Sequence, residues 1–247
     1  MGKRPGVRRR GRGGMQFRAA ATQKLKPAKY PSFSLDEERK GEIIDLVHES
    51  GRDVPLSKVR FEDGAISFIP APLGTKVGQR ISFGLNSEII DGNVISIQNI
   101  PDGTIVCNVE QQFGDGGALM KSAGADATVF SHADDGVILK LASGKFKKLN
   151  PKNRAMIGTL AGGGVEDRPF MRAGVKMMRF KSKGQKYPIV RGVAQAAYVH
   201  PHGGGRHQHV GQSSTVSRDA PPGAKVGSIA AKKTGRARIK ERKQSIK

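Results

Sequence analysis

The feature that most constrains this chain is the distribution of its charge. Residues 1–35 hold ten Lys and Arg and no Asp or Glu, and residues 168–247 hold 19 Lys and Arg and two acidic residues. Residues 36–167 hold 14 basic and 19 acidic residues, so the middle is weakly acidic within a chain of net charge +22. Segments as basic as the two ends repel themselves until a polyanion neutralises them. Nucleic acid is the expected partner, ahead of an acidic membrane surface.

Both ends also lack the apolar pattern of a folded domain. The first 14 residues alternate Arg with Gly, and the C-terminal segment is rich in Gly, Pro, His, Lys and Arg, with few apolar residues. Such segments cannot bury enough apolar surface to offset the entropy that is lost when they become ordered. We therefore expect residues 1–35 and 168–247 to be irregular basic extensions that become ordered against a polyanion.

The middle of the chain has the pattern of short antiparallel strands, in which apolar or alternating runs are separated by turn pairs such as Asp-Gly and Ser-Gly. The expected strands lie at 41–50, 59–62, 65–72, 80–84, 93–100, 104–110, 127–133, 137–142 and 145–149. Their spacing is typical of small barrels or sandwiches. The predicted fold is mainly β, with one small barrel at 36–84 and a second at 85–167. The only helix expected in this region covers 118–123.

One cysteine, Cys107, is present in an apolar run, so neither an intramolecular disulfide nor a thiolate zinc site is expected. A buried structural cysteine is the expected role. The chain has no apolar stretch of about 18 residues, which argues against a transmembrane helix. The lack of a disulfide framework and of an apolar N-terminal region argues against secretion.

The common catalytic motifs do not occur. Neither a strand–GxGxxG–helix unit nor a Gly-x-Ser-x-Gly elbow is present, and GDGGALMKSAG at 114–124 lacks the Gly-Lys-Ser/Thr ending of a phosphate loop. The adjacent acids Asp134 and Asp135 precede a glycine at an expected hairpin turn, where turn geometry explains them. We therefore expect a protein that is not an enzyme, with no catalytic residue and no small-molecule substrate.

The stretch HPHGGGRHQH at 200–209 holds four of the six histidines. It could supply imidazole ligands to zinc, form a solvated flexible loop, or bring backbone close to RNA. No carboxylate lies within nine residues and no cysteine is near, which argues against zinc. Glycine lets the main chain approach phosphate, and His and Arg stack on bases or donate hydrogen bonds. In a segment this basic we favour the third interpretation, and we predict no metal site.

Three longer stretches point to one family. They are IPDGTIVCNVEQQFGDGGALMKSAGA at 100–125, NPKNRAMIGTLAGGG at 150–164 and VRGVAQAAYVHPHGGGRHQHVG at 190–211. They resemble the universal L-two family of large-subunit ribosomal proteins, and the resemblance covers essentially the whole chain. Residues 205–236 are similar to the archaeal and eukaryotic branch. The resemblance implies an OB-like barrel, then an SH3-like barrel, with long basic extensions threaded into ribosomal RNA.

The resemblance also implies a role. It indicates a structural, cytoplasmic constituent of the large ribosomal subunit that binds ribosomal RNA, touches neighbouring ribosomal proteins, and supports subunit association, tRNA binding and the peptidyl-transferase region. No cofactor is implied beyond Mg²⁺ ions bridging protein and RNA. Two positions depart from the family pattern. The chain reads AQAAYV at 194–199 and so lacks an Asp that would orient His200, and Lys121 stands where Arg is more usual.

We predict RNA contacts from the basic extensions, from two positions in the middle and from the His-Gly segment. The residues are Arg8, Arg9, Arg10, Arg12, Arg18, Lys121, Ser122, Arg154, Arg172, Arg179, Lys181, Lys183, Lys186, Arg191, His200, His202, Gly203, Gly204, Gly205, Arg206, His207, His209, Arg218, Lys225, Lys232, Lys233 and Arg236. A free OB-type nucleic-acid chaperone is the main alternative, and it would need base-stacking aromatics on the barrel surface. Against it, most of the ten Phe lie in strand runs expected to be core. A metalloenzyme built on the histidines is the least favoured alternative.

Overall fold

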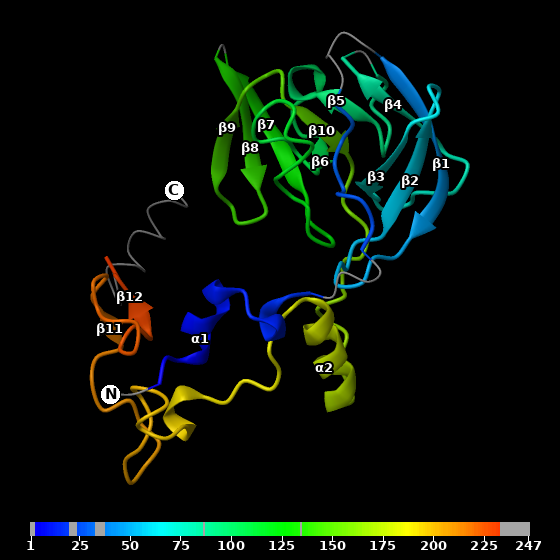
Figure 1. Cartoon of the computed structure of the whole chain (residues 1–247). Helices are drawn as coiled ribbons and strands as arrows, with labels where there is room; N and C mark the ends of the chain where they lie inside the picture. The colour runs from blue at the N-terminus through cyan, green and yellow to red at the C-terminus, as the bar shows by residue number, and fades with distance from the viewer. Residues whose placement is uncertain (1–2, 20–23, 33–37, 86, 134, 233–247) are drawn as a thin grey trace. The chain divides into compact units, whose positions relative to one another are not determined.

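The computed structural model describes residues 3–19, 24–32, 38–85, 87–133 and 135–232 (Figure 1). The chain divides into two compact units. The first, here called the sheet unit, comprises Ala20–Val175. The second, the terminal unit, combines Met1–Ala19 with Lys176–Lys247. Most of the basic residues of both chain ends therefore belong to a unit distinct from the weakly acidic middle.

Ten strands of the sheet unit form one sheet in the order β3-β2-β1-β4-β5-β10-β6-β7-β8-β9. The strands are β1 Arg39–Val47, β2 Leu56–Phe61, β3 Ile66–Pro70, β4 Arg80–Gly84, β5 Val94–Ser96, β6 Ile105–Cys107, β7 Ala127–Ala133, β8 Gly136–Leu141, β9 Phe146–Leu149 and β10 Arg154–Ile157. The first nine overlap the nine predicted runs, and the predicted mainly β fold class is confirmed.

The strand pairing explains why β10 was not predicted. Strands β1–β3 and β7–β9 are antiparallel meanders whose neighbours are close in sequence, and β4 pairs with β5 in parallel. Strand β10 returns from the end of the unit and pairs antiparallel with both β5 and β6. It therefore joins the two halves of the sheet, through contacts that no local turn signal announces.

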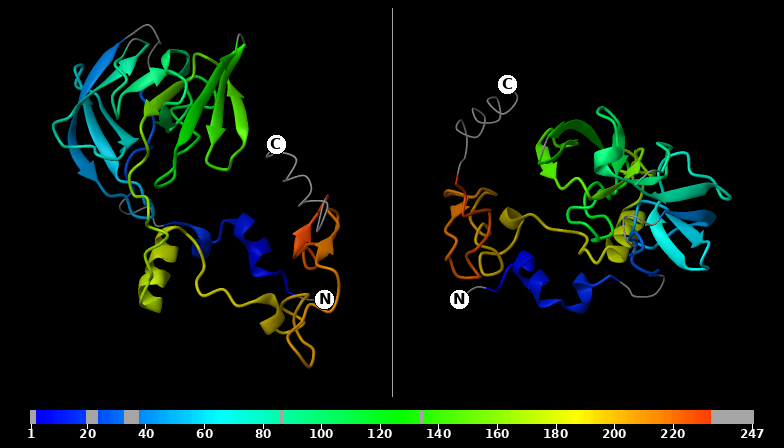
Figure 2. Two further views of the ribbon diagram at one scale, coloured as in Figure 1. Left: turned by 180° about the vertical axis from the view of Figure 1, so that it is seen from behind. Right: turned by 90° about the horizontal axis from the view of Figure 1, so that it is seen from above.

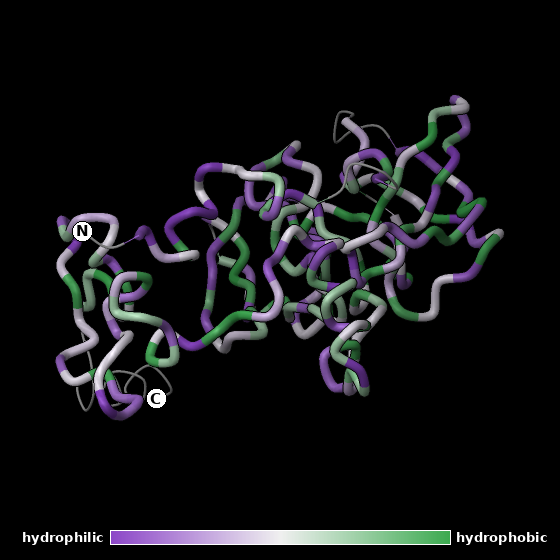
Figure 3. The backbone as a smooth tube through the Cα atoms, turned by 60° about the horizontal axis from the view of Figure 1, so that its bottom comes forward, coloured by the Kyte–Doolittle hydropathy of each residue, from purple (hydrophilic) through white to green (hydrophobic). Residues whose placement is uncertain are grey.

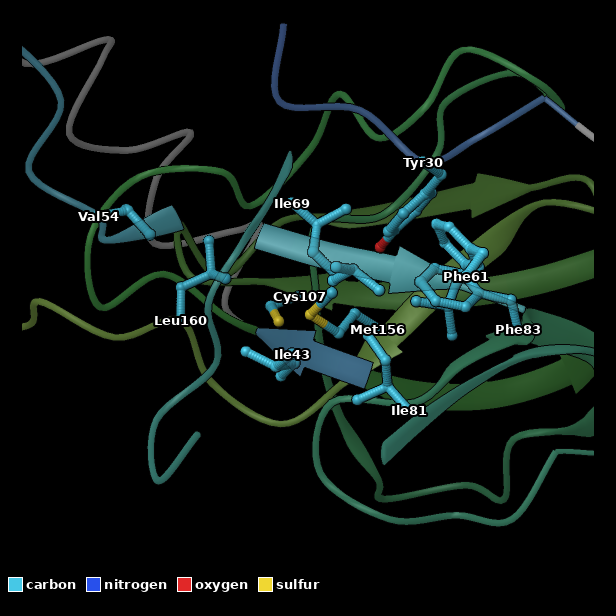
Figure 4. Packing of buried hydrophobic residues seen from close by; sticks show 12 residues of the cluster. Tyr30, Ile43, Val54, Phe61, Ile69, Ile81, Phe83, Cys107, Met156 and Leu160 are labelled. Atoms are coloured by element: carbon cyan, nitrogen blue, oxygen red, sulfur yellow. The ribbon is translucent and has the colours of Figure 1, made fainter. Parts of the chain in front are cut away.

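The sheet unit has two hydrophobic cores rather than one. The first gathers side chains from β1–β4, among them Ile43, Phe61 and Phe83 (Figure 4). The second gathers side chains from β5 to β9 with the short helix η3, Ile97–Asn99. Strands β5, β6 and β10 supply both cores, because successive side chains of a strand point to opposite faces. In β6, for example, Cys107 enters the first core and Val106 the second.

Two separate cores are what two barrel-type domains require. The OB-like and SH3-like assignments, and the boundaries at residues 36, 85 and 168, stay predictions. The buried structural role of Cys107 is confirmed, because the side chain is fully buried and is a free thiol.

One helix prediction is wrong. Residues 118–123 form no helix, because Leu119 pairs with Val109 in an isolated bridge and Met120 has a φ of +48°. A backbone in that region of φ cannot continue a right-handed helix. The two glycines that precede this stretch, Gly116 and Gly117, also have positive φ, so the segment is a loop with left-handed turns.

The basic ends contain more regular structure than the prediction of irregular extensions allowed. They form α1 Gly6–Arg9, η1 Arg10–Arg12, η2 Met15–Phe17, α2 Ala173–Ser182, η4 Gly192–Ala194, β11 Thr215–Val216 and β12 Ser228–Ile229 (Figures 1 and 2). The residues of α2 are mostly good helix formers such as Lys, Met and Arg, which a composition argument overlooks. Every helix in the described part of the chain is too short or too polar to span a lipid bilayer.

Candidate nucleic-acid interface

The terminal unit combines a high positive charge with very few buried residues. Residues 3–19 and 176–232 hold 17 Lys and Arg and a single acidic residue, Asp219. Among these described residues only Pro5 and Val226 are buried. Hydrophobic and hydrophilic stretches alternate along its backbone (Figure 3). The apolar side chains and the cations of this unit are therefore both left for a partner to cover.

Contacts between the two chain ends hold the terminal unit together. The backbone N–H of Lys3 donates to the carbonyl of Tyr198 at 2.7 Å, and the Lys3 ammonium lies 5.6 Å from the Tyr198 ring centroid. Farther along, Arg8 Nε donates to the carbonyl of Lys225 at 3.0 Å. Residues about 200 positions apart thus meet in one unit. Periodicity and composition carry no signal for such pairing.

A groove of about 500 Å³ in the terminal unit brings several predicted residues together. Its lining includes the cations Arg10, Lys186 and Arg191 together with His200. Much of the remaining wall is apolar. It includes Ile189 and Val190, which the sequence marks as apolar anchors in the basic segment, and also Val7, Phe17 and Pro188, which it does not. Cations beside apolar walls suit a nucleotide, since phosphate needs the charge and a base needs the apolar surface.

His200 is oriented by its own loop. The backbone N–H of His202 donates to His200 Nδ1 at 3.1 Å, so the neutral imidazole carries its proton on Nε2. A Cβ on Gly192 would lie 2.3 Å from the His200 ring, which shows how closely the ring packs on that backbone. Partial burial, and then the neighbouring His202, lower the pKa of His200. The lowered pKa favours the uncharged ring, which presents one N–H donor, although no aspartate precedes it.

The three glycines after His202 are needed by the loop itself. A Cβ on Gly203 would lie 2.3 Å from the carbonyl oxygen of Gln195, while Gly204 and Gly205 have φ of +80° and +82°. The first position lacks room for a side chain, and the other two have the left-handed backbone that glycine favours. The sequence argument attributed these glycines to close approach to RNA. The structure shows an intramolecular requirement for each of them.

The histidines of residues 200–209 do not gather into one cluster. The rings of His200 and His202 lie 5.1 Å apart, while His207 and His209 are exposed. Across the described residues, no group of three or more His, Cys, Asp or Glu side chains is arranged to hold a metal ion.

Most predicted RNA-contact residues lie where a partner can reach them. The exposed ones are Arg9, Arg10, Arg12, Arg18, Ser122, Arg172, Lys181, Arg191, Gly204, Gly205, Arg206, His207, His209, Arg218 and Lys232. Those of intermediate exposure are Arg8, Lys121, Arg179, Lys183, Lys186, His200, His202, Gly203 and Lys225. Lys233 and Arg236 lie outside the described residues.

Arg154 does not fit its predicted role. Its side chain is 4% exposed, and it donates from Nη2 to Glu110 Oε1 at 2.6 Å and from Nε to Glu110 Oε2 at 3.1 Å. It also donates to the carbonyl of Pro31 at 3.1 Å. A guanidinium engaged in this way cannot reach a phosphate, so we reassign Arg154 to the core. The sequence shows that Arg154 is a cation within a family motif. It does not show that Glu110, 44 residues earlier, lies against it.

Lys121 is also partly committed to the fold. Its ammonium donates to the carbonyls of Ala28 at 2.5 Å and Gly117 at 2.8 Å. Burial lowers the pKa of Lys121, and the nearby cations Arg52 and Lys29 lower it further. A negatively charged group beside these cations, such as a phosphate, would offset the repulsion between them.

Comparison with known proteins decides the family. The family model described as "Ribosomal Proteins L2, C-terminal domain" matches residues 90–225. The large ribosomal subunit protein uL2 of Nitrosopumilus maritimus is 76% identical over 244 residues, which cover 98% of this chain and all of the relative. The chain belongs to the uL2 family.

Other uL2 proteins support the same conclusion. That of Cenarchaeum symbiosum is 75% identical over 243 residues, covering 98% of this chain and all of the relative. That of Korarchaeum cryptofilum is 48% identical over 238 residues, covering 96% of this chain and 97% of the relative. These relatives are archaeal and fall within the archaeal and eukaryotic branch to which residues 205–236 are similar. As a uL2 protein, the chain is a structural component of the large ribosomal subunit and not an enzyme.

Proposed function

We propose that the chain binds large-subunit ribosomal RNA chiefly through its terminal unit. The observation that carries this proposal is the mismatch between charge and core. The described residues 3–19 and 176–232 hold 17 Lys and Arg and one acidic residue, and only two of these residues are buried. A polyanion that the chain can thread through supplies both the neutralising charge and the missing buried surface. Folded ribosomal RNA has both properties.

Within this proposal the loop at residues 200–205 is a rigid element seated near the peptidyl-transferase region. Its support is the ordered geometry of His200 and the glycines, which presents a single imidazole N–H without a metal or a catalytic partner among the described residues. The groove lined by Arg10, Lys186 and Arg191 lies beside the same histidine and provides the phosphate contacts. By this geometry the loop assists RNA packing, tRNA binding and subunit association without performing chemistry.

The sheet unit has a different task in the proposal. Its residues 36–167 are weakly acidic and suit neighbouring ribosomal proteins of basic character, while the chain works in the cytoplasm as part of the ribosome. In this role it uses no cofactor of its own, and Mg²⁺ enters only where an ion is shared with RNA phosphates.

Sedimentation of a cell extract tests the proposal. The protein should travel with large subunits through a high-salt wash, because a threaded extension is held by shape as well as by charge. Recovery of the protein in the soluble fraction, with large subunits intact, would favour the free chaperone instead.

A further inference from the structure

An outward face of the sheet unit carries two exposed phenylalanines. Phe130 on β7 and Phe146 on β9 are each 55% exposed, whereas the core residues Phe61 and Phe83 are 4% and 0% exposed. The sequence argument placed most phenylalanines in the core. Of the nine that the structure describes, only Phe61 and Phe83 are buried. The aromatic surface required for base stacking is therefore present.

Strand register builds a continuous face around these rings. Ile105 on β6 is paired with Thr128 on β7, Thr128 with Lys140 on β8, and Lys140 with Phe146 on β9. The first three point away from the second core, because an adjacent residue of the same strand is buried in that core: Val106, Val129 and Leu139. Phe146 is paired with Lys140 and is 55% exposed. Phe130 joins the row, since its ring centroid lies 4.8 Å from that of Phe146 at an interplanar angle of 63°. We call these five residues the aromatic–lysine face.

The strands at one side of this face are rich in cations. Residues 137–149, which cover most of β8 and all of β9, hold four Lys and no acid. Lys148 is bound to Asp135, but Lys140 and the exposed Lys145 form no ion pair with any described residue. Cations beside exposed aromatic rings are complementary to a phosphate chain with unpaired bases.

We propose that the aromatic–lysine face binds unpaired bases of ribosomal RNA, which stack on Phe130 and Phe146 while Lys140 and Lys145 contact the phosphates. This inference rests on the proposed RNA-binding function but uses a surface separate from the terminal unit. A basic groove alone would bind duplex and single strands alike. Two aromatic rings that are half exposed on a rigid sheet add a preference for bases that are free to stack.

Tryptophan fluorescence tests the proposal directly, because the chain contains no Trp. In the full-length F130W variant the single indole reports on this face. A single-stranded RNA of about 12 nucleotides, within the usual site size, should quench its emission by stacking. An RNA duplex of equal length should bind the basic extensions without quenching. In the matched control V77W, at a loop position 60% exposed, neither RNA should quench.

Leucine substitutions separate base stacking from apolar contact with a protein. The double variant F130L/F146L keeps apolar side chains but removes both π-faces. Because both positions are exposed, the fold should be retained, and a melting curve checks this. At high salt, where phosphate contacts weaken, its affinity for the single strand should fall about 5- to 150-fold for each base that stacks on the two rings. Two results would overturn the assignment of this face to base stacking and favour a protein partner. One is unchanged affinity of the double variant, and the other is equal quenching of F130W and V77W while filter binding shows that RNA is bound. Failure of all RNA to bind would overturn the proposed function itself.

Discussion

The Arg154→Met substitution distinguishes a core ion pair from an RNA contact. It leaves Glu110 fully buried, with its two oxygens deprived of the guanidinium bonds at 2.6 and 3.1 Å. The backbone N–H groups of Gly116 and Arg154 still donate to the carboxylate at 3.1 Å, but they carry no charge. Removing one partner of a buried ion pair costs about 3–5 kcal/mol. We expect a loss of that order in the free energy of unfolding.

Urea unfolding of the full-length chain, followed by circular dichroism, measures this loss. Adding Glu110→Gln to the variant removes the uncompensated charge, so part of the stability should return. The return should be incomplete, because the single amide oxygen of Gln replaces two carboxylate oxygens that accept from the backbone N–H groups of Gly116 and Arg154. Below the unfolding transition, R154M should bind ribosomal RNA as the unaltered chain does. By contrast, Arg206→Met, at an exposed cation, should weaken binding. An R154M protein of unaltered stability but reduced RNA affinity would refute the reassignment of Arg154 to the core.

Three further outcomes follow from the structure. Gly203→Ala should distort its loop even in the absence of RNA, because the new Cβ would lie 2.3 Å from the carbonyl oxygen of Gln195, whereas Gly205→Ala should cost only about 1–2 kcal/mol of backbone strain. Amide exchange of the loop measures the difference, and equal protection in the two variants would contradict it. Burial raises the pKa of Cys107 to about 12 from 9.0, so the thiol ionises at lower pH in the unfolded chain, and the free energy of unfolding should fall between these pH values by up to about 1.4 kcal/mol per pH unit. Urea midpoints at several pH values measure this fall, which should be absent in the control variant Cys107→Ala. Limited trypsin digestion should leave a resistant fragment near residues 36–167, and its rapid loss would contradict a folded sheet unit.

The strands could be predicted because their signals are local. Each of the first nine combines an apolar run with a turn pair next to it, and meander pairing follows from short connections. Strand β10 has only four residues, begins with the cation Arg154 and pairs with strands some 50 residues earlier, so local pattern could not reveal it. Residues 118–123 have helix-forming composition, but pairing with Val109 overrides it.

The candidate site was predictable in its charge and not in its geometry. Counting cations along the chain located the extensions, since electrostatic character survives without knowledge of the fold. Contacts such as that between Arg8 and Lys225, or the packing of Gly203 on Gln195, join residues whose proximity only the folded chain defines. Burial was the other missing quantity. It reversed the expectation for Arg154, which is inside, and for Phe130 and Phe146, which are outside.

The salt dependence of RNA binding tests the central claim most directly. Each phosphate contact contributes about 0.7 to 0.9 to the slope of log affinity against log salt. Replacing the exposed Arg9, Arg10 and Arg12 of the terminal unit by Gln should therefore flatten the slope by about 2 to 3 if each makes one contact. The matched replacement of three exposed cations of the sheet unit, Lys40, Lys76 and Arg80, should leave the slope unchanged. Equal flattening by both triple variants, or flattening by the sheet-unit variant alone, would contradict the account in which the terminal unit is the principal RNA-binding surface.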